Sequence, residues 1–290
     1  MALTQDNMAQ VILAAPIGIC VTSAAGLFEL VNPAYCELYG YREEELLGRH
    51  FTLVVPEANR QTLSELHDRF IAGGADQEVT AEWEVQCKGG EARHILANAA
   101  RIVDPGGAVR KVTYVVDITE RKQMERRLDF LARCDELTGL LNRRAGLAHL
   151  EEEVARSQRY GVALSVAACD LDHFKQVNDR HGHAAGDRVL REAAARMVQA
   201  LRQQDQVIRM GGEEFLVVLP CTALEDACLA MERLRLSLSA LPIGELRQTL
   251  SVGVAELRQG ETMAALLERA DRALYRAKAQ GRDLVIQASP

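Results

Sequence analysis

The sequence carries no excess of positive charge and no long hydrophobic run. Its 290 residues include 34 Lys and Arg against 41 Asp and Glu, which gives a net charge of −7. This balance excludes the basic face that nucleic-acid-binding proteins need, so we expect no nucleic acid partner. The longest early apolar run, Val11 to Val21, is interrupted by Pro16 and Gly18 and is shorter than the roughly 18 residues of a membrane span. We therefore expect no membrane segment.

The start of the chain also lacks the positively charged region of a secretory signal, because its first Lys or Arg is Arg42. The seven cysteines are odd in number and form no CxxC pair. This usage is typical of reduced, mostly buried thiols rather than of a disulfide framework. We therefore expect a cytoplasmic protein.

The length predicts two domains of about 100–200 residues each, and the first, over residues 1–118, has the pattern of an α+β module. "GICVTSAAGLFELVN" predicts two strands around a turn, and "PAYCELYG", "REEELLG" and "RQTLSELHDRFIAGG" predict helices that end in glycine. Three strand-like runs follow, Val79 to Gln86, Ala92 to Val103 and Val109 to Val116, separated by the turn signals "KGG" and "DPGG". An antiparallel sheet with flanking helices is expected.

Residues 119–134 predict a helical linker. The segment is rich in charge, and Met124, Leu128 and Leu131 are spaced by four and three residues. This is the spacing of a coiled coil, so a dimeric linker is expected. A single solvated connecting helix is the alternative.

The second domain, over residues 135–290, alternates strands with helices. A buried strand, Val162 to Cys169, directly precedes Asp170, and a helix is expected from Gly186 to about Gln203. The stretch "DQVIRMGGEEFLVVLP" predicts a hairpin, and Ala223 to Ala240 predicts another helix. "TLSVGVAEL" and "MAALLERADRALYRAKAQ" add a strand and a helix. A sheet covered by helices is expected.

Carboxylates stand at the ends of these strands. Asp170 follows one strand, while Glu213 and Glu214 lie at the tip of the hairpin. If the strands are neighbours, three carboxylates converge, and oxygen ligands of this kind suit a hard cation such as Mg²⁺. The alternative is that Asp170 and Asp172 cap the following turn while the two glutamates are solvated.

Five motifs in order resemble the GGDEF domain of diguanylate cyclases: "DELTGLLNRR", "DLDHFKQVNDRHGHAAGD", "RMGGEEF", "SVGVAE" and "ADRALYRAKAQGRD". The name-giving motif is the GGEEF variant, with Glu213 in place of aspartate. The resemblance implies a palm-like domain with a central mixed five-stranded sheet covered by helices. It also implies condensation of two GTP into cyclic di-GMP with release of two pyrophosphates.

The resemblance implies roles for individual residues. Two Mg²⁺ or Mn²⁺ ions per active site would be held by Asp170, the carbonyl of Leu171, Glu213 and Glu214, and Glu213 would help to deprotonate the attacking 3′-hydroxyl. GTP binding is assigned to His173, Phe174, Lys175, Asn178, Asp187, Lys278 and Arg282, with guanine read by Asn178 and Asp187 and phosphates by the others.

Simpler explanations exist for several of these residues. Lys175 is expected on a solvated loop, Asn178 could form a turn with Asp179, and Asp187 could cap the helix that follows Gly186. Lys278 and Arg282 could be cations favoured in a last helical turn.

An RxxD motif, Arg202 to Asp205, precedes the hairpin at the place where the resembled family carries an inhibitory product site. Arg202 and Asp205 would bind cyclic di-GMP, with Arg209 assisting. A solvated helix end with a weak local ion pair is the alternative.

The first domain resembles a PAS sensor through "NPAYCELYGYREEELLGR" and "VVDITERKQME". It departs from flavin-binding photosensors, since no cysteine occurs in "GRHFTLVVP" after Gly48. His67 lies where haem-binding relatives carry an iron ligand, with a surface histidine as the alternative, and Trp83 is expected in the core or the pocket wall. The PAS ligand is unknown.

Three function classes follow: a signal-regulated diguanylate cyclase working as a homodimer, a silent receptor of GTP or cyclic di-GMP, and a PAS-based scaffold. The complete set of matching site residues favours the first.

Overall fold

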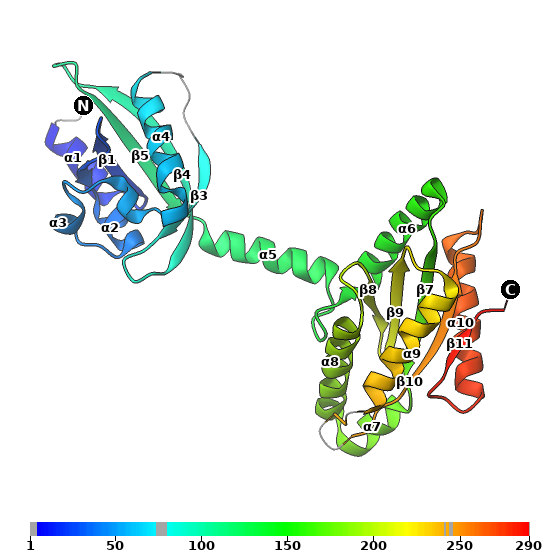
Figure 1. Ribbon diagram of the computed structural model, residues 1–290. Helices are drawn as coiled ribbons and strands as arrows, with labels where there is room; N and C mark the ends of the chain where they lie inside the picture. The colour runs from blue at the N-terminus through cyan, green and yellow to red at the C-terminus, as the bar shows by residue number, and fades with distance from the viewer. Residues whose placement is uncertain (1–4, 74–79, 241, 244–245, 290) are drawn as a thin grey trace. The chain divides into compact units, whose positions relative to one another are not determined.

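The computed structural model describes residues 5–73, 80–240, 242–243 and 246–289. The chain divides into two compact units, residues 1–127 and 128–290, and the boundary between them falls within helix α5 (Thr119–Arg133) (Figure 1). Among the described helices, none combines the length and the hydropathy that crossing a membrane requires. All seven cysteines are free; three are buried, three are partly buried, and Cys221 is exposed.

The N-terminal unit is built on a five-stranded antiparallel sheet in the order β2-β1-β5-β4-β3. Its strands are β1 (Gly18–Ser23), β2 (Phe28–Val31), β3 (Ala81–Gln86), β4 (Ala92–Val103) and β5 (Val109–Asp117), and its helices are α1 (Gln5–Ala14), α2 (Pro33–Tyr39), α3 (Glu43–Leu46) and α4 (Arg60–Ile71), with short 3₁₀ turns at Phe51–Val54 and Glu57–Asn59. The expected antiparallel module with flanking helices is confirmed. The predicted start of the third strand at Val79 lies outside the described residues.

Buried side chains and one polar cap fix this unit. The largest fully buried side chains of its core are Phe28, Tyr39 and Leu46. Asn32 is fully buried, and its side-chain oxygen accepts hydrogen bonds from the backbone N–H groups of Ile19 and Tyr35. Because Asn32 is also the N-cap of α2, it ties the first helix after the β1–β2 hairpin to strand β1.

Helix α5 is a single helix of 15 residues in which Met124, Leu128 and Leu131 are 69%, 66% and 37% exposed. The structure therefore shows a helical linker, and no long coiled coil is evident within the described part of the chain.

The C-terminal unit has a mixed six-stranded sheet in the order β11-β10-β7-β9-β8-β6. The strands are β6 (Leu141–Asn142), β7 (Leu164–Leu171), β8 (Gln206–Gly211), β9 (Glu214–Pro220), β10 (Leu250–Glu256) and β11 (Val285–Gln287). The prediction of five strands is wrong by one. The two edge strands, β6 and β11, have two and three residues and pair in parallel with β8 and β10, so their sequences are too short to show an alternating pattern.

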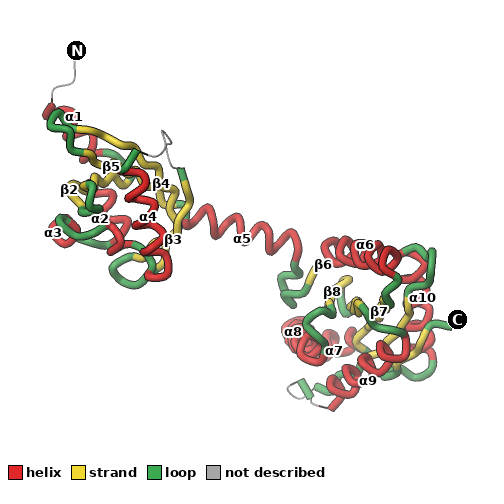
Figure 2. The backbone as a smooth tube through the Cα atoms, turned by 45° about the horizontal axis from the view of Figure 1, so that its top comes forward, coloured by secondary structure: helices red, strands yellow, loops and turns green. Residues whose placement is uncertain are grey.

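Helices cover both faces of this sheet. The helices are α6 (Arg143–Tyr160), α7 (Phe174–His181), α8 (His183–Ala200), α9 (Leu224–Ala240) and α10 (Met263–Ala279). One core packs α8 and α9 against one face of the sheet, and a second packs α6 and α10 against the other. Figure 2 shows the strands between these helices. All eight residues of β7 are buried, as expected for a central strand covered on both sides.

Candidate active site

The site begins where β7 ends beside the β8–β9 hairpin. Strands β7 and β9 pair antiparallel, and this register sets Asp170 directly opposite Glu214. The N–H of Leu171 donates to the carbonyl of Glu213 at 3.3 Å. The predicted neighbourhood of the two strands is therefore confirmed, and it brings Asp170, Glu213 and Glu214 to one edge of the sheet, the one at which the central strand β7 ends and β9 begins.

Asp170 is buried, and its carboxylate forms a 2.6 Å ion pair with the ammonium of Lys278 in the last turn of α10. Burial raises the pKa of Asp170 above its ordinary value; Lys278 opposes this rise, while the nearby Glu213 and Glu214 add to it. The pKa of Asp271, about two turns earlier on α10, is also raised by burial and by Glu214. A site with this much negative charge favours a cation.

The donors at this edge fit a hard divalent ion in type: carboxylate oxygens and the carbonyl of Leu171. With the side chains placed as they are, the described residues contain no group of three or more His, Cys, Asp or Glu arranged to hold a metal. The Lys278 ammonium takes the place of a metal's positive charge at Asp170. The residues therefore fit the ion by chemistry, and Lys278 occupies one of the two carboxylate oxygens of Asp170.

The turn after β7 leads into the short helix α7. His173 is its N-cap and adopts a left-handed backbone conformation with φ of 56°, which is uncommon for a residue other than glycine. Phe174 is buried and anchors the start of the helix, whereas Lys175 is exposed. A left-handed residue at a helix start directs successive backbone N–H groups outward, an arrangement that suits phosphate oxygens.

Asn178 and Asp187 lie on the adjoining helices α7 and α8. A Cβ atom at Gly186 would lie 2.0 Å from the Oδ1 atom of Asn178, so only glycine permits this close approach. Helix α8 begins at His183 with Gly182 as its cap, and Asn178 lies with Asp179 inside α7. The two simpler explanations, a cap at Asp187 and an Asn178–Asp179 turn, are therefore wrong.

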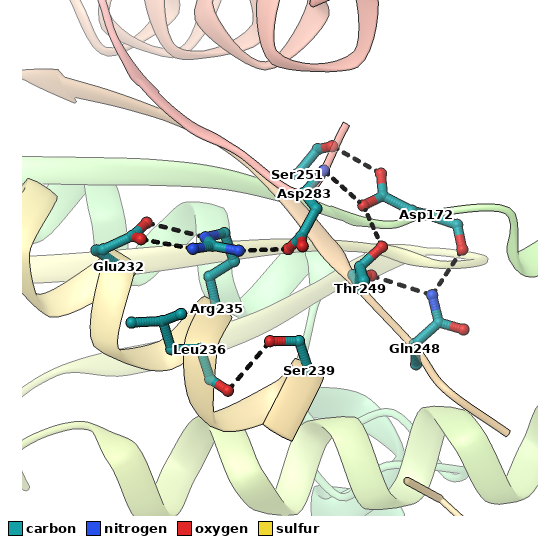
Figure 3. Close-up of polar contacts among 9 residues, drawn as sticks. All are labelled: Asp172, Glu232, Arg235, Leu236, Ser239, Gln248, Thr249, Ser251 and Asp283. Atoms are coloured by element: carbon teal, nitrogen blue, oxygen red, sulfur yellow. Dashed lines mark hydrogen bonds and ion pairs between the residues drawn. The ribbon is translucent and has the colours of Figure 1, made fainter. Parts of the chain in front are cut away.

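Asp172, two residues beyond Asp170, belongs to a separate buried network that the sequence did not predict (Figure 3). Its carboxylate accepts hydrogen bonds from the hydroxyls of Thr249 and Ser251 at 2.7 and 2.6 Å, and from the backbone N–H of Asp283 at 3.0 Å. The partner of Asp170 is therefore Lys278 on α10, and the partners of Asp172 are Ser251 on β10, Thr249 and Asp283. The prediction that the two aspartates cap the following turn is wrong.

The same network holds the loop that carries Arg282. Arg282 and Asp283 both adopt left-handed conformations, with φ of 67° and 46°, immediately after the end of α10. The carboxylate of Asp283 accepts a 2.6 Å hydrogen bond from Arg235 of α9, whose other donors hold Glu232 (Figure 3). Arg282 thus lies beyond the last helical turn, in a loop fixed from two sides.

The RxxD motif forms the tight turn between α8 and β8. Arg202 N–H donates to Asp205 Oδ2 at 2.9 Å, and Asp205 N–H donates to the Arg202 carbonyl at 3.0 Å. The other carboxylate oxygen of Asp205 is buried and has no hydrogen-bond partner. Arg209, on β8, directs its guanidinium to Asp135 and to the carbonyl of Gly212.

Comparisons with known proteins agree with this arrangement. Residues 132–284 match the diguanylate cyclase GGDEF domain family, and residues 14–123 match a PAS fold. The chain is 50% identical over 153 residues to diguanylate cyclase DgcP of Pseudomonas aeruginosa, covering 51% of this chain and 23% of DgcP. It is 34% identical over 277 residues to diguanylate cyclase DgcM of Escherichia coli K12, covering 94% of this chain and 66% of DgcM.

Among solved structures, the active GGEEF domain of a diguanylate cyclase from Vibrio cholerae superposes with a TM-score of 0.51 at 34% identity, covering 52% of this chain and 99% of that domain. The chain thus has two compact units, and the second is a helix-covered sheet with carboxylates gathered at one edge. Together they define a sensor module joined to a nucleotide-processing domain. The chain belongs to the GGDEF family of diguanylate cyclases and carries a PAS fold before its GGDEF domain. It spans less than two-thirds of the length of DgcP and of DgcM.

Proposed function

We propose that the protein is a sensor-regulated diguanylate cyclase that converts two GTP into cyclic di-GMP and two pyrophosphates. The observation that carries this proposal is the pairing of Asp170 with Glu214 beside Lys278 at one edge of the sheet. The names of its relatives DgcP and DgcM, both diguanylate cyclases, support it. The solved Vibrio cholerae structure, described as the active GGEEF domain of a diguanylate cyclase, supports the same role for the GGEEF motif here.

The proposed reaction forms one bond and breaks one bond in each half. The 3′-hydroxyl of one GTP attacks the α-phosphorus of the other, the α–β phosphoanhydride bond breaks, and pyrophosphate leaves. The hydroxyl proton goes to Glu213 or through it to water. A second identical step in the opposite direction closes the ring.

Asp170, the Leu171 carbonyl, Glu213 and Glu214 would hold Mg²⁺ or Mn²⁺, two ions per active site. These ions would supply charge neutralisation of the triphosphate and polarisation of the α-phosphate. The raised pKa of Asp170 supports this assignment, because a buried carboxylate among like charges is stabilised in its ionised form by a bound cation.

The chain's own side chains would orient GTP. Asn178 and Asp187 would bind the guanine edge, since a carboxylate can accept from N1–H and the 2-amino group together. The backbone N–H groups at His173 and Phe174, with Lys175, would hold phosphate oxygens. Lys278 would exchange Asp170 for a phosphate oxygen when GTP binds, and Arg282 would assist it.

Residues 1–118 would form the PAS sensor, 119–134 the linker, and 135–290 the cyclase domain. Each cyclase domain would offer one guanine pocket, whereas the product contains two guanosines, so two copies must face each other. The exposed Met124, Leu128 and Leu131 of α5 support a parallel two-stranded linker. Joining two copies there would raise the effective concentration of the half-sites. Light scattering that finds a fully active monomer at high concentration would contradict this arrangement.

The RxxD turn would bind the product and slow the enzyme. The buried Asp205 oxygen without a donor supports this, because a guanine N–H group could satisfy it. Arg202 would contact a phosphate or a guanine edge through its planar guanidinium. Arg209 would join them only by giving up donors now directed to Asp135 and Gly212.

The decisive experiment incubates the whole protein with GTP and Mg²⁺ and identifies products by mass. We expect cyclic di-GMP from the wild type and none from Glu213→Gln or Glu214→Gln, with the folded state of each variant checked by circular dichroism. Glu225→Gln, an exposed glutamate of α9, is the matched control and should retain full turnover. Undiminished turnover in both hairpin variants would overturn the assignment of these carboxylates.

A further inference from the structure

The N-terminal unit contains a small internal cavity of about 90 Å³ between its sheet and α4. Its wall includes Thr22, Phe51, Leu63, His67, Trp83 and Lys111. About 10–15 Å³ of such space is enough to hold one water, so the cavity has room for several waters. It is far below the roughly 300–1,000 Å³ of pockets for drug-sized ligands, and therefore too small for haem or flavin.

Two buried polar atoms that line this cavity have no hydrogen-bond partner. Thr22 and His67 are each only 2% exposed, yet Thr22 Oγ1 and His67 Nδ1 are both unsatisfied. The prediction of a surface histidine at position 67 is therefore wrong. His67 Nε2 lies 3.2 Å from the carbonyl oxygen of Ala24, which places the ring proton on Nε2 and leaves Nδ1 as an acceptor. Unsatisfied buried groups of this kind usually have a water or ligand partner.

A cation completes the polar side of the cavity. Lys111 on β5 lies directly opposite Thr22 on β1, so the two side chains share one face of the sheet. Its ammonium lies 5.7 Å and 5.4 Å from the ring centres of Phe51 and Phe70. No described residue forms an ion pair with it, and no described wall residue is an Asp or Glu. Burial lowers the pKa of Lys111, which is the response of a cation without a buried counter-charge.

His67 belongs to the same cluster, because its ring packs against Phe51 with centroids 5.1 Å apart. The ring of Phe51 is therefore shared by the ammonium of Lys111 and the imidazole of His67. The remaining walls include the apolar Leu63 and Trp83 and also Tyr35, Tyr39 and Thr113. The cavity thus offers one cation, one unsatisfied hydroxyl and one unsatisfied acceptor beside a small hydrophobic space.

We propose that this cavity binds a short 2-hydroxycarboxylate of about two to four carbons. The carboxylate would accept hydrogen bonds from Lys111 and Thr22, the hydroxyl would donate to Nδ1 of His67, and the short carbon chain would face the apolar wall. An anion would supply the counter-charge that the Lys111 ammonium lacks. Only a ligand that also carries a hydrogen-bond donor can bind the Nδ1 acceptor of His67. This site extends the proposed function. Binding of the ligand is independent of that function, and only an effect of the ligand on turnover rests on it.

Calorimetry on the full-length protein without GTP tests the site separately from catalysis. The probes are lactate, propionate, which lacks the hydroxyl, and propane-1,2-diol, which lacks the charge. We expect saturable binding of lactate, binding of propionate about tenfold weaker because His67 stays unpaired, and no binding of the diol. Equal binding of all three probes, or no saturable binding of lactate, would overturn the proposal, and so would equally tight binding of inorganic phosphate.

Three variants assign the contacts. Lys111→Met should weaken lactate binding about 10- to 100-fold, the loss expected for a charged hydrogen bond. His67→Phe keeps the ring contact and should make lactate and propionate bind alike. Thr22→Val, nearly equal in shape, should weaken both acids and replaces Lys111→Met if that variant does not fold. Lys88→Met, which removes an exposed cation of the same unit, should leave binding unchanged. Unchanged lactate binding in Lys111→Met or Thr22→Val would contradict the assignment, whatever the result for GTP turnover.

Discussion

Arg209 donates hydrogen bonds to both carboxylate oxygens of Asp135, at 2.8 and 3.0 Å, from the strand that leads into the GGEEF hairpin. The other N–H groups of the same guanidinium hold the Gly212 carbonyl at 3.0 and 2.9 Å. Burial alone would raise the pKa of Asp135, but Arg209 and Thr138 lower it below its usual value. Asp135, which follows the linker helix in sequence, is therefore ionised and holds the arginine that positions the hairpin tip.

Asp135→Asn should slow turnover without abolishing GTP binding. The neutral amide binds the guanidinium of Arg209 more weakly, and Arg209 then no longer holds the carbonyl of Gly212 in place. Glu213 and Glu214 therefore lose their exact placement. Since a shift of about 1 Å can cost about 10²-fold in rate, we expect kcat to fall about tenfold or more. Steady-state kinetics should show KM for GTP changed much less than kcat. The control is Asp226→Asn, an exposed residue in the first turn of α9; equal kcat in both variants would contradict the positioning role.

Asp170→Asn should abolish turnover but not destabilise the protein in the presence of a chelator. The folded-state pKa of Asp170 is raised, so the fold favours its protonated form. The stability from that form is complete below the ordinary pKa and is lost as pH rises through the raised pKa. At neutral pH the ionised carboxylate therefore costs stability, and a neutral amide removes this cost. Thermal unfolding at pH 7 should give an equal or higher Tm for the variant, and near pH 3 any gain should vanish; a clear drop in Tm at pH 7 would disprove the argument.

Asp172→Asn, two residues away, should behave in the opposite manner. One Asp172 oxygen accepts from Thr249 and from the N–H of Asp283, and an amide nitrogen in its place could accept neither. Losing charge-assisted buried hydrogen bonds should cost about 1.5–3 kcal/mol. We expect a Tm several degrees lower and a raised KM for GTP, because the left-handed loop of Arg282 is released. Unchanged Tm and KM would show that the network in Figure 3 does not fix this loop.

Gly186→Ala should weaken GTP binding by displacing Asn178. The added Cβ would lie 2.0 Å from Asn178 Oδ1, so the side chain must move from its place against Gly186. Loss of one guanine hydrogen bond should raise KM about 5- to 15-fold. Adding Asn178→Ala should relieve the clash and restore stability without restoring affinity. Ala184→Ser, an exposed change in the first turn of the same helix, is the control. If Gly186→Ala binds GTP as the wild type does, Asn178 is not a guanine contact.

Local sequence patterns predicted most of the fold and the neighbourhood of the site. The alternation and turn signals located the central strands, and the structure adds the register of β7 with β9 that sets Asp170 against Glu214. The short edge strands β6 and β11 escaped prediction because two or three residues carry no pattern. The start of α8 was misplaced because Gly186 resembles a helix boundary, whereas it is a glycine that admits Asn178.

The partners of Asp172 could not be predicted from local sequence, because Thr249, Ser251 and Asp283 lie 77 to 111 residues away along the chain. The one available signal was the pair of aspartates in "DLD", but residues two apart on a strand face the same side of the sheet, so this spacing does not separate their roles. Asp170 lies at the edge of the sheet where the negative charge favours a cation, and Asp172 fixes the loop of Arg282.

Arg202→Ala should relieve inhibition by cyclic di-GMP while leaving the initial rate in its absence unchanged. Arg202 is exposed, and the RxxD turn presents it beside the unsatisfied buried oxygen of Asp205. Product bound there would favour a state in which the two cyclase domains are held apart, and a shift of this kind requires tighter binding to that state. Removing one charged contact should raise the inhibitory concentration about 10- to 100-fold. Initial rates with added cyclic di-GMP measure this, with the exposed Arg233→Ala of α9 as the matched control. Equal inhibition of the wild type and both variants, or none of any, would mean that this RxxD is only the turn between α8 and β8.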